Sequence, residues 1–475
     1  MENKLSFWST YRVFFKSALI GALILLLLIP TFFIQNLVSE RQQRQQEAVT
    51  EISSRWAAPQ TITAPVIGIP YLDGVTENGN TQLIKRWAYF LPGKLDLKTR
   101  LIPEKRYRGI YQVVVYTTEL QIHGSFDSLH FDDLTLSPDR MLWKEATVFF
   151  DVTDLQGLSQ DMTLHLSAQT TAAQTTPAQT TTAQATPAAQ PTTAQTADLD
   201  LAPAHRSTDQ FKTALSATLP DWLPAAAKNT LEFSATLKLK GSGNLSFVPT
   251  GRETTVEATS PWRDPSFTGS ALPEVRSIKE DGFAADWKVL AINRKFPQQW
   301  KQGVYDLDNA AFGVSLIIPV DPYQQTTRSV KYAILIILLT FTAFLLIEWV
   351  YDKAIHTVQY TLVGFALCIF YTLLLSLSEY LGFNGAYILA AVATIGLIAW
   401  YVGSLLRSSR MALFITFLLV VQYGFVFTLI QLKDYALLVG SIGLFITLAI
   451  VMYFSRKIKW DTQRPDPQTW PPVNS

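Results

Sequence analysis

Residues 332–349 read YAILIILLTFTAFLLIEW, a run of 18 positions in which Glu348 is the single charged residue. Roughly 20 apolar residues at about 1.5 Å per residue cross a hydrocarbon core of about 30 Å, so this run has the length of a membrane span. Four more apolar runs follow it, at about 360–378, 386–406, 411–430 and 435–454. The C-terminal region, residues 330–455, is therefore predicted to be a bundle of five transmembrane helices.

Another apolar block lies near the start of the chain, at residues 18–38. Lys4, Arg12 and Lys16 precede it and a polar run follows it. A cleaved signal peptide has a shorter apolar region followed by a small-residue cleavage site, and this block has neither feature. It is predicted to be an uncleaved signal anchor, transmembrane helix 1 of six.

The positions of Lys and Arg predict the orientation, because positive flanks of membrane spans stay in the cytoplasm. With the N-terminus inside, the short outer loops near 380 and 433 carry only Lys433. The cytoplasmic segments then carry Lys4, Arg12, Lys16, Lys353, Arg407, Arg410, Arg456, Lys457, Lys459 and Arg464. Residues 1–17 and 456–475 are thus predicted to be cytoplasmic and residues 39–329 to lie outside the cytoplasmic membrane, in a multi-pass protein surrounded by membrane lipids.

Residues 39–329 have the pattern of a β-rich domain. Apolar and polar residues alternate over 231–240, the period of two that is typical of a strand with one buried face. A turn-forming stretch follows, and residues 245–248 are predicted to return as the hairpin partner. Frequent proline and glycine separate such runs, which favours a sandwich-like, mostly antiparallel domain. Further strand candidates are residues 110–122, 143–152 and 314–320.

Two stretches depart from this β pattern. Residues 39–56 are polar, rich in Gln and free of Gly and Pro, so they are predicted to prolong the first helix outward, with Glu40 and Arg44 paired. From Ser167 to Thr196 the chain uses only Ser, Ala, Gln, Thr and Pro, which bury too little apolar area to offset the entropy of ordering. Residues 167–200 are predicted to be a disordered insert. It is a spacer that provides reach, a contact with the cell wall, or a tolerated repeat expansion in a surface loop.

The composition excludes several classes of function. Lys and Arg number 39 against 38 Asp and Glu, so the formal net charge of +1 provides no electrostatic footprint for nucleic acid. Cys368 is the single cysteine, which excludes a disulfide framework, a thiolate metal cluster and a CxxC redox motif. No cofactor and no nucleic-acid partner are predicted.

The sequence contains none of the common catalytic motifs. It has no G-x-S-x-G, H-E-x-x-H, G-x-x-x-x-G-K-[ST] or G-x-G-x-x-G pattern. His123 and His130 lie near Asp127, Asp132 and Asp133, but a solvated loop is the simpler interpretation, and no metal site is predicted. The protein is predicted not to be an enzyme.

Glu348, Glu379 and Asp434 are the acidic residues at the ends of the predicted spans. A charge at a helix centre costs about 2.5–3.5 kcal/mol in a membrane, whereas near the interface the cost is small. Interfacial capping is therefore the simpler interpretation of all three. The alternative is that Glu348 and Glu379 line a path for protons or a solute together with the polar residues Gln359, Gln422 and Gln431. None of the spans has the midplane carboxylate that such a path requires.

A further candidate surface is the proline-bounded turn W-R-D-P-S-F at 262–267. It presents an aromatic ring on Trp262 and a guanidinium on Arg263, a pair suited to binding a partner. The simpler interpretation is that Trp262 fills the core of its own domain.

Seven stretches together carry a likeness to a known family: RYRGIYQV at 106–113, SPWRDPSFTG at 260–269, FGVSLIIPVDPYQ at 312–324, RSVKYA at 328–333, VQYTLVG at 358–364, SLSE at 376–379 and QLKDYALLVG at 431–440. They resemble the CreD family of bacterial inner membrane proteins, also described as cell envelope integrity proteins. The tract of Ala, Gln, Thr and Pro departs from that family's pattern. The resemblance implies an anchor, a large periplasmic region and a multi-span C-terminal half. It also implies a link to envelope stability and toxin tolerance, under a two-component regulatory system in some bacteria, but assigns no reaction or ligand.

Three hypotheses follow. The first is an envelope protein without catalytic activity, whose periplasmic β domain binds a periplasmic protein or a cell-wall partner, or senses a wall or lipid state. The second is a transporter or channel formed by the C-terminal bundle, with the periplasmic domain as lid or substrate collector. The third is a membrane-embedded enzyme acting on lipid or wall precursors, which would need clustered carboxylates or histidines at the outer leaflet.

Overall fold

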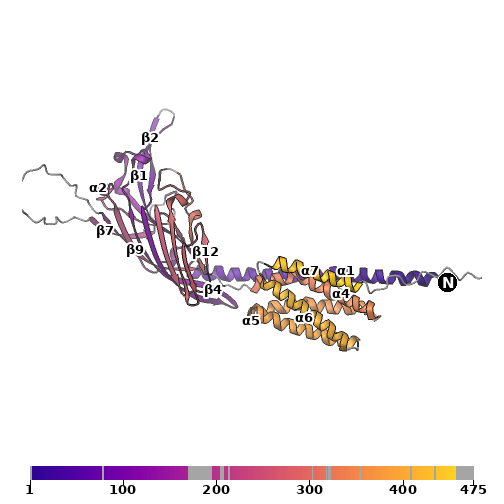
Figure 1. Cartoon of the computed structure of the whole chain (residues 1–475). Helices are drawn as coiled ribbons and strands as arrows, with labels where there is room; N and C mark the ends of the chain where they lie inside the picture. Colours follow the sequence, from indigo (N-terminus) through magenta and orange to yellow (C-terminus); the bar gives the residue numbers. More distant parts are fainter. Residues whose placement is uncertain are drawn as a thin grey trace, which may run out of the picture. The chain divides into compact units, whose positions relative to one another are not determined.

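Figure 1 shows the protein as a computed structural model. The structure describes residues 3–455 except 78–79, 169–194, 204–207, 212–213, 302, 317, 319–321, 352–354, 407–408 and 433–434.

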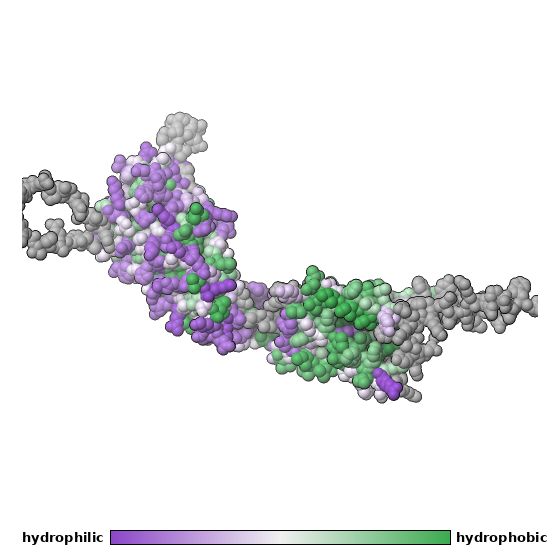
Figure 2. Space-filling view, viewed as in Figure 1, coloured by the Kyte–Doolittle hydropathy of each residue, from purple (hydrophilic) through white to green (hydrophobic). Residues whose placement is uncertain are grey.

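The chain divides into two compact units. A helical unit contains residues 1–46 and 320–475, and a β unit contains residues 47–319. Hydrophobic residues cover the visible face of the helical unit, whereas hydrophilic residues predominate on that of the β unit (Figure 2). The expected organisation of an N-terminal apolar helix, a central β-rich region and C-terminal apolar helices is confirmed.

Within the described ranges, five helices are long and apolar enough to cross a membrane. A short amphipathic helix, α3, precedes the first C-terminal one and was not expected from the hydropathy pattern. The helices are α1 (Asn3–Trp56), α2 (Leu223–Ala226), α3 (Pro322–Lys331), α4 (Ala333–Tyr351), α5 (Thr357–Leu406), α6 (Ser409–Gln431) and α7 (Ala436–Ser455).

Helix α5 has 50 residues and corresponds to two of the predicted spans. Gly382, at φ 70° and ψ 167°, interrupts its helical geometry, a conformation that glycine adopts without steric cost. The rings of Phe370 and Tyr387 lie 5.3 Å apart across this break. Their separation in a continuous helix would be about 25 Å, so the chain folds back at Gly382.

Helix α1 continues without interruption to Trp56, so residues 39–56 prolong the first helix as predicted. The expected pair forms, with Arg44 Nη2 donating to Glu40 Oε1 at 2.7 Å. One face of the helix is buried in the helical unit, because its side chains recur at helical spacing. They are Ile20, Leu27, Thr31, Ile34 and Val38.

Sixteen strands of the β unit form one sheet. They are β1 (Gln60–Glu77), β2 (Asn80–Phe90), β3 (Lys94–Arg108), β4 (Tyr111–Phe126), β5 (Thr147–Val152), β6 (Met162–Ala168), β7 (Gln195–Pro203), β8 (Leu215–Thr218), β9 (Leu231–Ser242), β10 (Asn244–Val248), β11 (Glu253–Ser260), β12 (Pro265–Gly269), β13 (Val275–Lys279), β14 (Gly282–Leu290), β15 (Gln299–Lys301) and β16 (Phe312–Leu316).

The order along the sheet is β12-β16-β10-β1-β5-β8-β7-β6-β9-β4-β3-β11-β14-β13, with β2 and β15 beside β1. Neighbours are antiparallel except β1 with β10 and β3 with β11. The sheet folds over on itself: the ring of Phe267 on β12 lies 5.6 Å from that of Trp287 on β14, near the opposite end of the order. A common apolar core between the halves includes Phe150 and Phe233, consistent with sandwich-like packing.

The predicted hairpin between 231–240 and 245–248 is wrong, although both segments are strands. β9 pairs with β4 and β6, whereas β10 pairs with β1 and β16. Only Gly243, at φ 65°, lies between β9 and β10. A hairpin requires about two turn residues, so the single residue directs the chain to another part of the sheet.

The ends of the predicted disordered insert are also corrected. β6 extends through Ala168 and β7 begins at Gln195, and these two residues are partners in an antiparallel pair. Leu199 and Leu201 on β7 are buried in the core, which supplies the apolar contacts that the tract itself lacks. The remainder of the predicted insert, residues 169–194, lies outside the described residues.

Candidate functional site

Glu348, near the end of α4, is bound by groups from two other helices. Lys16 Nζ on α1 pairs with Glu348 Oε1 and also donates to the carbonyl oxygen of Ile355 at 2.7 Å. Tyr360 Oη on α5 donates to Glu348 Oε2 at 3.3 Å. The carboxylate therefore links α1, α4 and α5.

Glu379, on α5, has a comparable environment. Arg41 Nε on α1 lies 3.7 Å from Glu379 Oε1, and the Glu379 side chain is only 8% exposed. Tyr323 Oη on α3 donates to the same oxygen at 3.2 Å. Both predicted glutamates are thus neutralised by a cation of α1.

The two pairs lie at opposite ends of the buried face of α1. Lys16 and Arg41 are 25 residues apart, about 38 Å along a helix, which exceeds the thickness of a hydrocarbon core of about 30 Å. Between them α1 buries apolar side chains and Thr31. The arrangement links α1 to the other helices through both glutamates. Interfacial capping by these residues stays a prediction.

Trp262 and Arg263 do not join these pairs. Asp434 lies outside the described residues. Trp262 is half-buried and packs against the core of the β unit, with its Nε1 donating to the Asp264 carbonyl at 3.1 Å. Lys105 Nζ lies 5.7 Å from the centroid of the Trp262 ring, and Arg263 is exposed.

A polar groove of about 670 Å³ crosses the exposed face of β11, β3, β4 and β9. Strand register places Arg100 opposite Glu119 and Glu119 opposite Lys238, so the three charges form one row across the sheet. None of the three forms an ion pair with a residue that the structure describes. In the adjacent row Lys98 Nζ pairs with Glu257 Oε2 at 3.0 Å.

Sequence reasoning missed this groove. Apolar and polar residues alternate over 231–240, which indicated only that one face of that strand is exposed to solvent. The row of charges depends on the register between β3, β4 and β9, and residues 100 and 238 are far apart in the chain. β3 and β4 form a hairpin whose register is set by the connection at 109–110. The pairing of β9 with β4 joins distant segments, and no signal in a single sequence specifies it.

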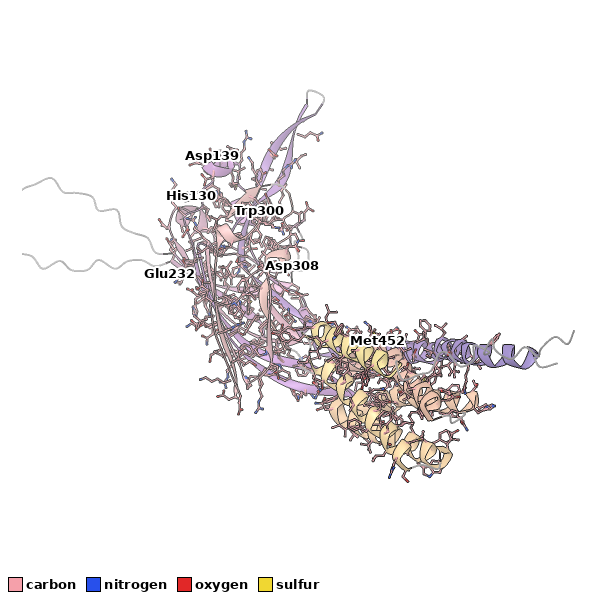
Figure 3. The ribbon with its side chains drawn as sticks, turned by 45° about the vertical axis from the view of Figure 1, so that its right-hand side comes forward. His130, Asp139, Glu232, Trp300, Asp308 and Met452 are labelled. Atoms are coloured by element: carbon pink, nitrogen blue, oxygen red, sulfur yellow. The ribbon has the colours of Figure 1, made fainter. Side chains whose placement is uncertain are left out.

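A second group of charges is acidic. Burial raises the pKa of Asp151, and the neighbouring Asp308 raises it further. Burial, followed by the charge of Asp306, raises the pKa of Asp308, which is labelled in Figure 3. Among the described residues no group of three or more His, Cys, Asp or Glu side chains could hold a metal ion. His123 lies on β4 and His130 in the loop that follows it.

Comparison with known proteins gives two findings. A sequence model of the family described as inner membrane protein CreD matches residues 12–461. Inner membrane protein CreD of Escherichia coli (strain K12) is 30% identical over 456 residues, which cover 94% of each chain. Both likenesses span the helical unit and the β unit.

Proposed function

This chain belongs to the CreD family of inner membrane proteins, and from that membership we propose that it supports the integrity of the cell envelope by binding an envelope component through its β unit. The helical unit is the anchor. The bound component is a periplasmic protein or a cell-wall partner with acidic groups, and no catalytic step is part of the proposed role.

The proposal places the β unit in the periplasm and both termini in the cytoplasm. Its support is the charge asymmetry of the connecting segments, in which positive residues gather at one side of the spans. The lengths of the apolar helices and the fold-back of α5 at Gly382 are compatible with this path.

Cysteine labelling tests the orientation. We expect Ser277→Cys, on the exposed strand β13, to react with a membrane-impermeant maleimide in cells whose outer membrane is permeabilised. Ser409→Cys, at the start of α6, should react only after the inner membrane is opened. Both variants carry Cys368→Ser so that the native thiol gives no signal. Labelling of Ser409→Cys in closed cells would contradict the orientation.

The polar groove on the β unit is the observation that carries the binding role. Arg100 and Lys238 flank Glu119 in one row, and none of these charges is satisfied by an ion pair with a described residue. Two cations on one open surface suit a partner that presents carboxylates or phosphates. The groove is open to solvent, as a surface for a macromolecule must be.

The helical unit supports the anchoring role rather than transport. Among the residues that the structure describes, Glu348 and Glu379 are the carboxylates of the predicted transport path, and each is neutralised by a cation of α1. A carboxylate held in this way fixes helices together. The pairs lie 25 residues apart along α1, too far for direct proton exchange between them.

Reversal of the groove charges tests the binding role. We expect Arg100→Glu with Lys238→Glu to abolish rescue of toxin sensitivity in a strain that lacks the protein, because an acidic partner is then repelled. The measurement is survival against an envelope-directed toxin at a protein level equal to that of wild type.

The matched control is Arg276→Glu with Lys279→Glu. It makes the same change of net charge on exposed residues of β13, outside the groove. Rescue by this control and failure of the groove variant would support the proposal. Equal rescue by both variants would show that the groove is not the binding surface.

A further inference from the structure

The helical unit contains a groove of about 880 Å³ between α4, α6 and α7. Its walls are almost entirely aliphatic or aromatic, with Leu339, Leu418 and Val451 among the lining residues. On α6 the lining extends from Arg410 to Val426, about 24 Å along the helix axis. The groove therefore follows most of one membrane span.

Helix α7 forms one wall without being buried itself. None of residues 436–453 of α7 is buried. Met452, which is labelled in Figure 3, is 62% exposed. At Gly443 the helix comes close to the ring of Phe425 on α6, where a Cβ atom would overlap the ring. Contact at this glycine holds α7 beside α6, while the groove separates α7 from α4.

A single basic side chain lies at one end of the groove. Arg410 is exposed, lines the groove and forms no ion pair with any residue in the described ranges. It occupies the second position of α6, where the backbone N–H groups and the helix dipole also favour an anion. Positive charge at the mouth and apolar walls beyond it are the complement of an anionic amphiphile.

Gln422 is a polar residue toward the end of the groove that is farther from Arg410. Gln422 is 7% exposed, and its Oε1 accepts a hydrogen bond from Thr340 Oγ1 at 3.0 Å. Its Nε2 has no partner among the described residues. It lies 12 residues from Arg410, about 18 Å, well beyond the polar part of a lipid whose phosphate is at Arg410.

We propose that this groove binds one anionic glycerophospholipid, with its phosphate on Arg410 and the α6 N-terminus and one acyl chain between α4, α6 and α7. The lipid fills the space between α7 and α4 and so joins α7 to the other helices. The proposed orientation of the chain assigns the lipid to the cytoplasmic leaflet. Binding itself does not depend on that orientation or on the function of the β unit.

Native mass spectrometry of the full chain tests the proposal. The purified protein is mixed with phosphatidylglycerol or phosphatidylcholine of identical acyl chains, and the retained lipid is counted. We expect wild type to retain one phosphatidylglycerol in preference to phosphatidylcholine. Arg410→Gln should reduce that preference about tenfold or more, because a charge-assisted hydrogen bond is lost. Equal retention of both lipids by wild type would overturn the proposal.

Two tryptophan variants provide a matched pair. Thr447→Trp places an indole in the groove and should abolish retention of the lipid. Leu448→Trp adds a similar bulk to α7 at a 58% exposed position outside the groove and should leave retention unchanged. Equal effects of the two variants would contradict an acyl chain in the groove.

Gln422→Leu separates an acyl chain from other occupants. An acyl chain should be retained as well or better next to leucine, because the unpaired amide is removed. Loss of binding in this variant would show that the occupant is polar at this depth and is not an acyl chain. A dimer in the spectrum that Thr447→Trp dissociates would assign the groove to a second copy of the chain, which would also overturn the proposal.

Discussion

Trp287→Ala is expected to lower the free energy of unfolding of the β unit by about 3–5 kcal/mol. Trp287 is 2% exposed on β14, and its ring lies 5.6 Å from that of Phe267 and 5.9 Å from that of Phe312. These contacts join strands near opposite ends of the sheet order, so their removal opens a cavity where the sheet folds over. Pulse proteolysis of the full chain across a urea series measures the change.

Trp262→Ala is the matched control for the same deletion of an indole. Trp262 is half-buried at the edge of the core, so its loss should cost about 1 kcal/mol and leave toxin rescue unchanged. An equal loss of unfolding free energy in both variants would show that Trp287 does not stabilise the packing of the two ends of the sheet against each other. Loss of rescue by a folded Trp262→Ala protein would instead restore the 262–267 turn as a binding surface.

Replacement of both glutamates of the helical unit, Glu348→Gln with Glu379→Gln, is expected to lower its free energy of unfolding by about 2–4 kcal/mol in total. Each exchange removes the charge of a carboxylate that is 12% or 8% exposed and that pairs with a cation of α1. Glutamine can still accept hydrogen bonds from the same partners, so the helices should remain assembled. Thermal melting of the purified chain measures the loss of stability. At a growth temperature below the melting temperature of the variant, rescue of toxin sensitivity should be retained.

A charge exchange controls for effects other than pairing. Lys16→Glu alone should destabilise the protein more than the glutamine variant, because two carboxylates then face each other. Lys16→Glu combined with Glu348→Lys should recover much of that loss, provided that cysteine labelling confirms an unchanged orientation. Loss of rescue by the double glutamine variant at normal protein level and orientation would contradict the anchoring role and favour transport.

Patterns that depend on near neighbours in the chain were predictable. The apolar run at 332–349 predicts a helix that is apolar on all sides, and the alternation at 231–240 predicts a strand with one apolar face. Both patterns lie within one segment, so they can be recognised without knowing what the segment packs against. The polar extension of α1 to Trp56 was predictable for the same reason. The positions of Glu348 and Glu379 at span ends also followed from the sequence.

Relations between distant segments were decided only by tertiary structure. Lys16 reaches Glu348 across 332 positions of the chain, and Arg100 joins Lys238 in one row through the register of three strands. The failed pairing of β9 with β10 shows that strand identity does not specify strand partners. The groove beside α7 likewise depends on how three helices pack. Hydropathy and periodicity act within one segment, whereas charge pairing, register and cavities depend on which segments meet, a choice set by packing of the whole chain.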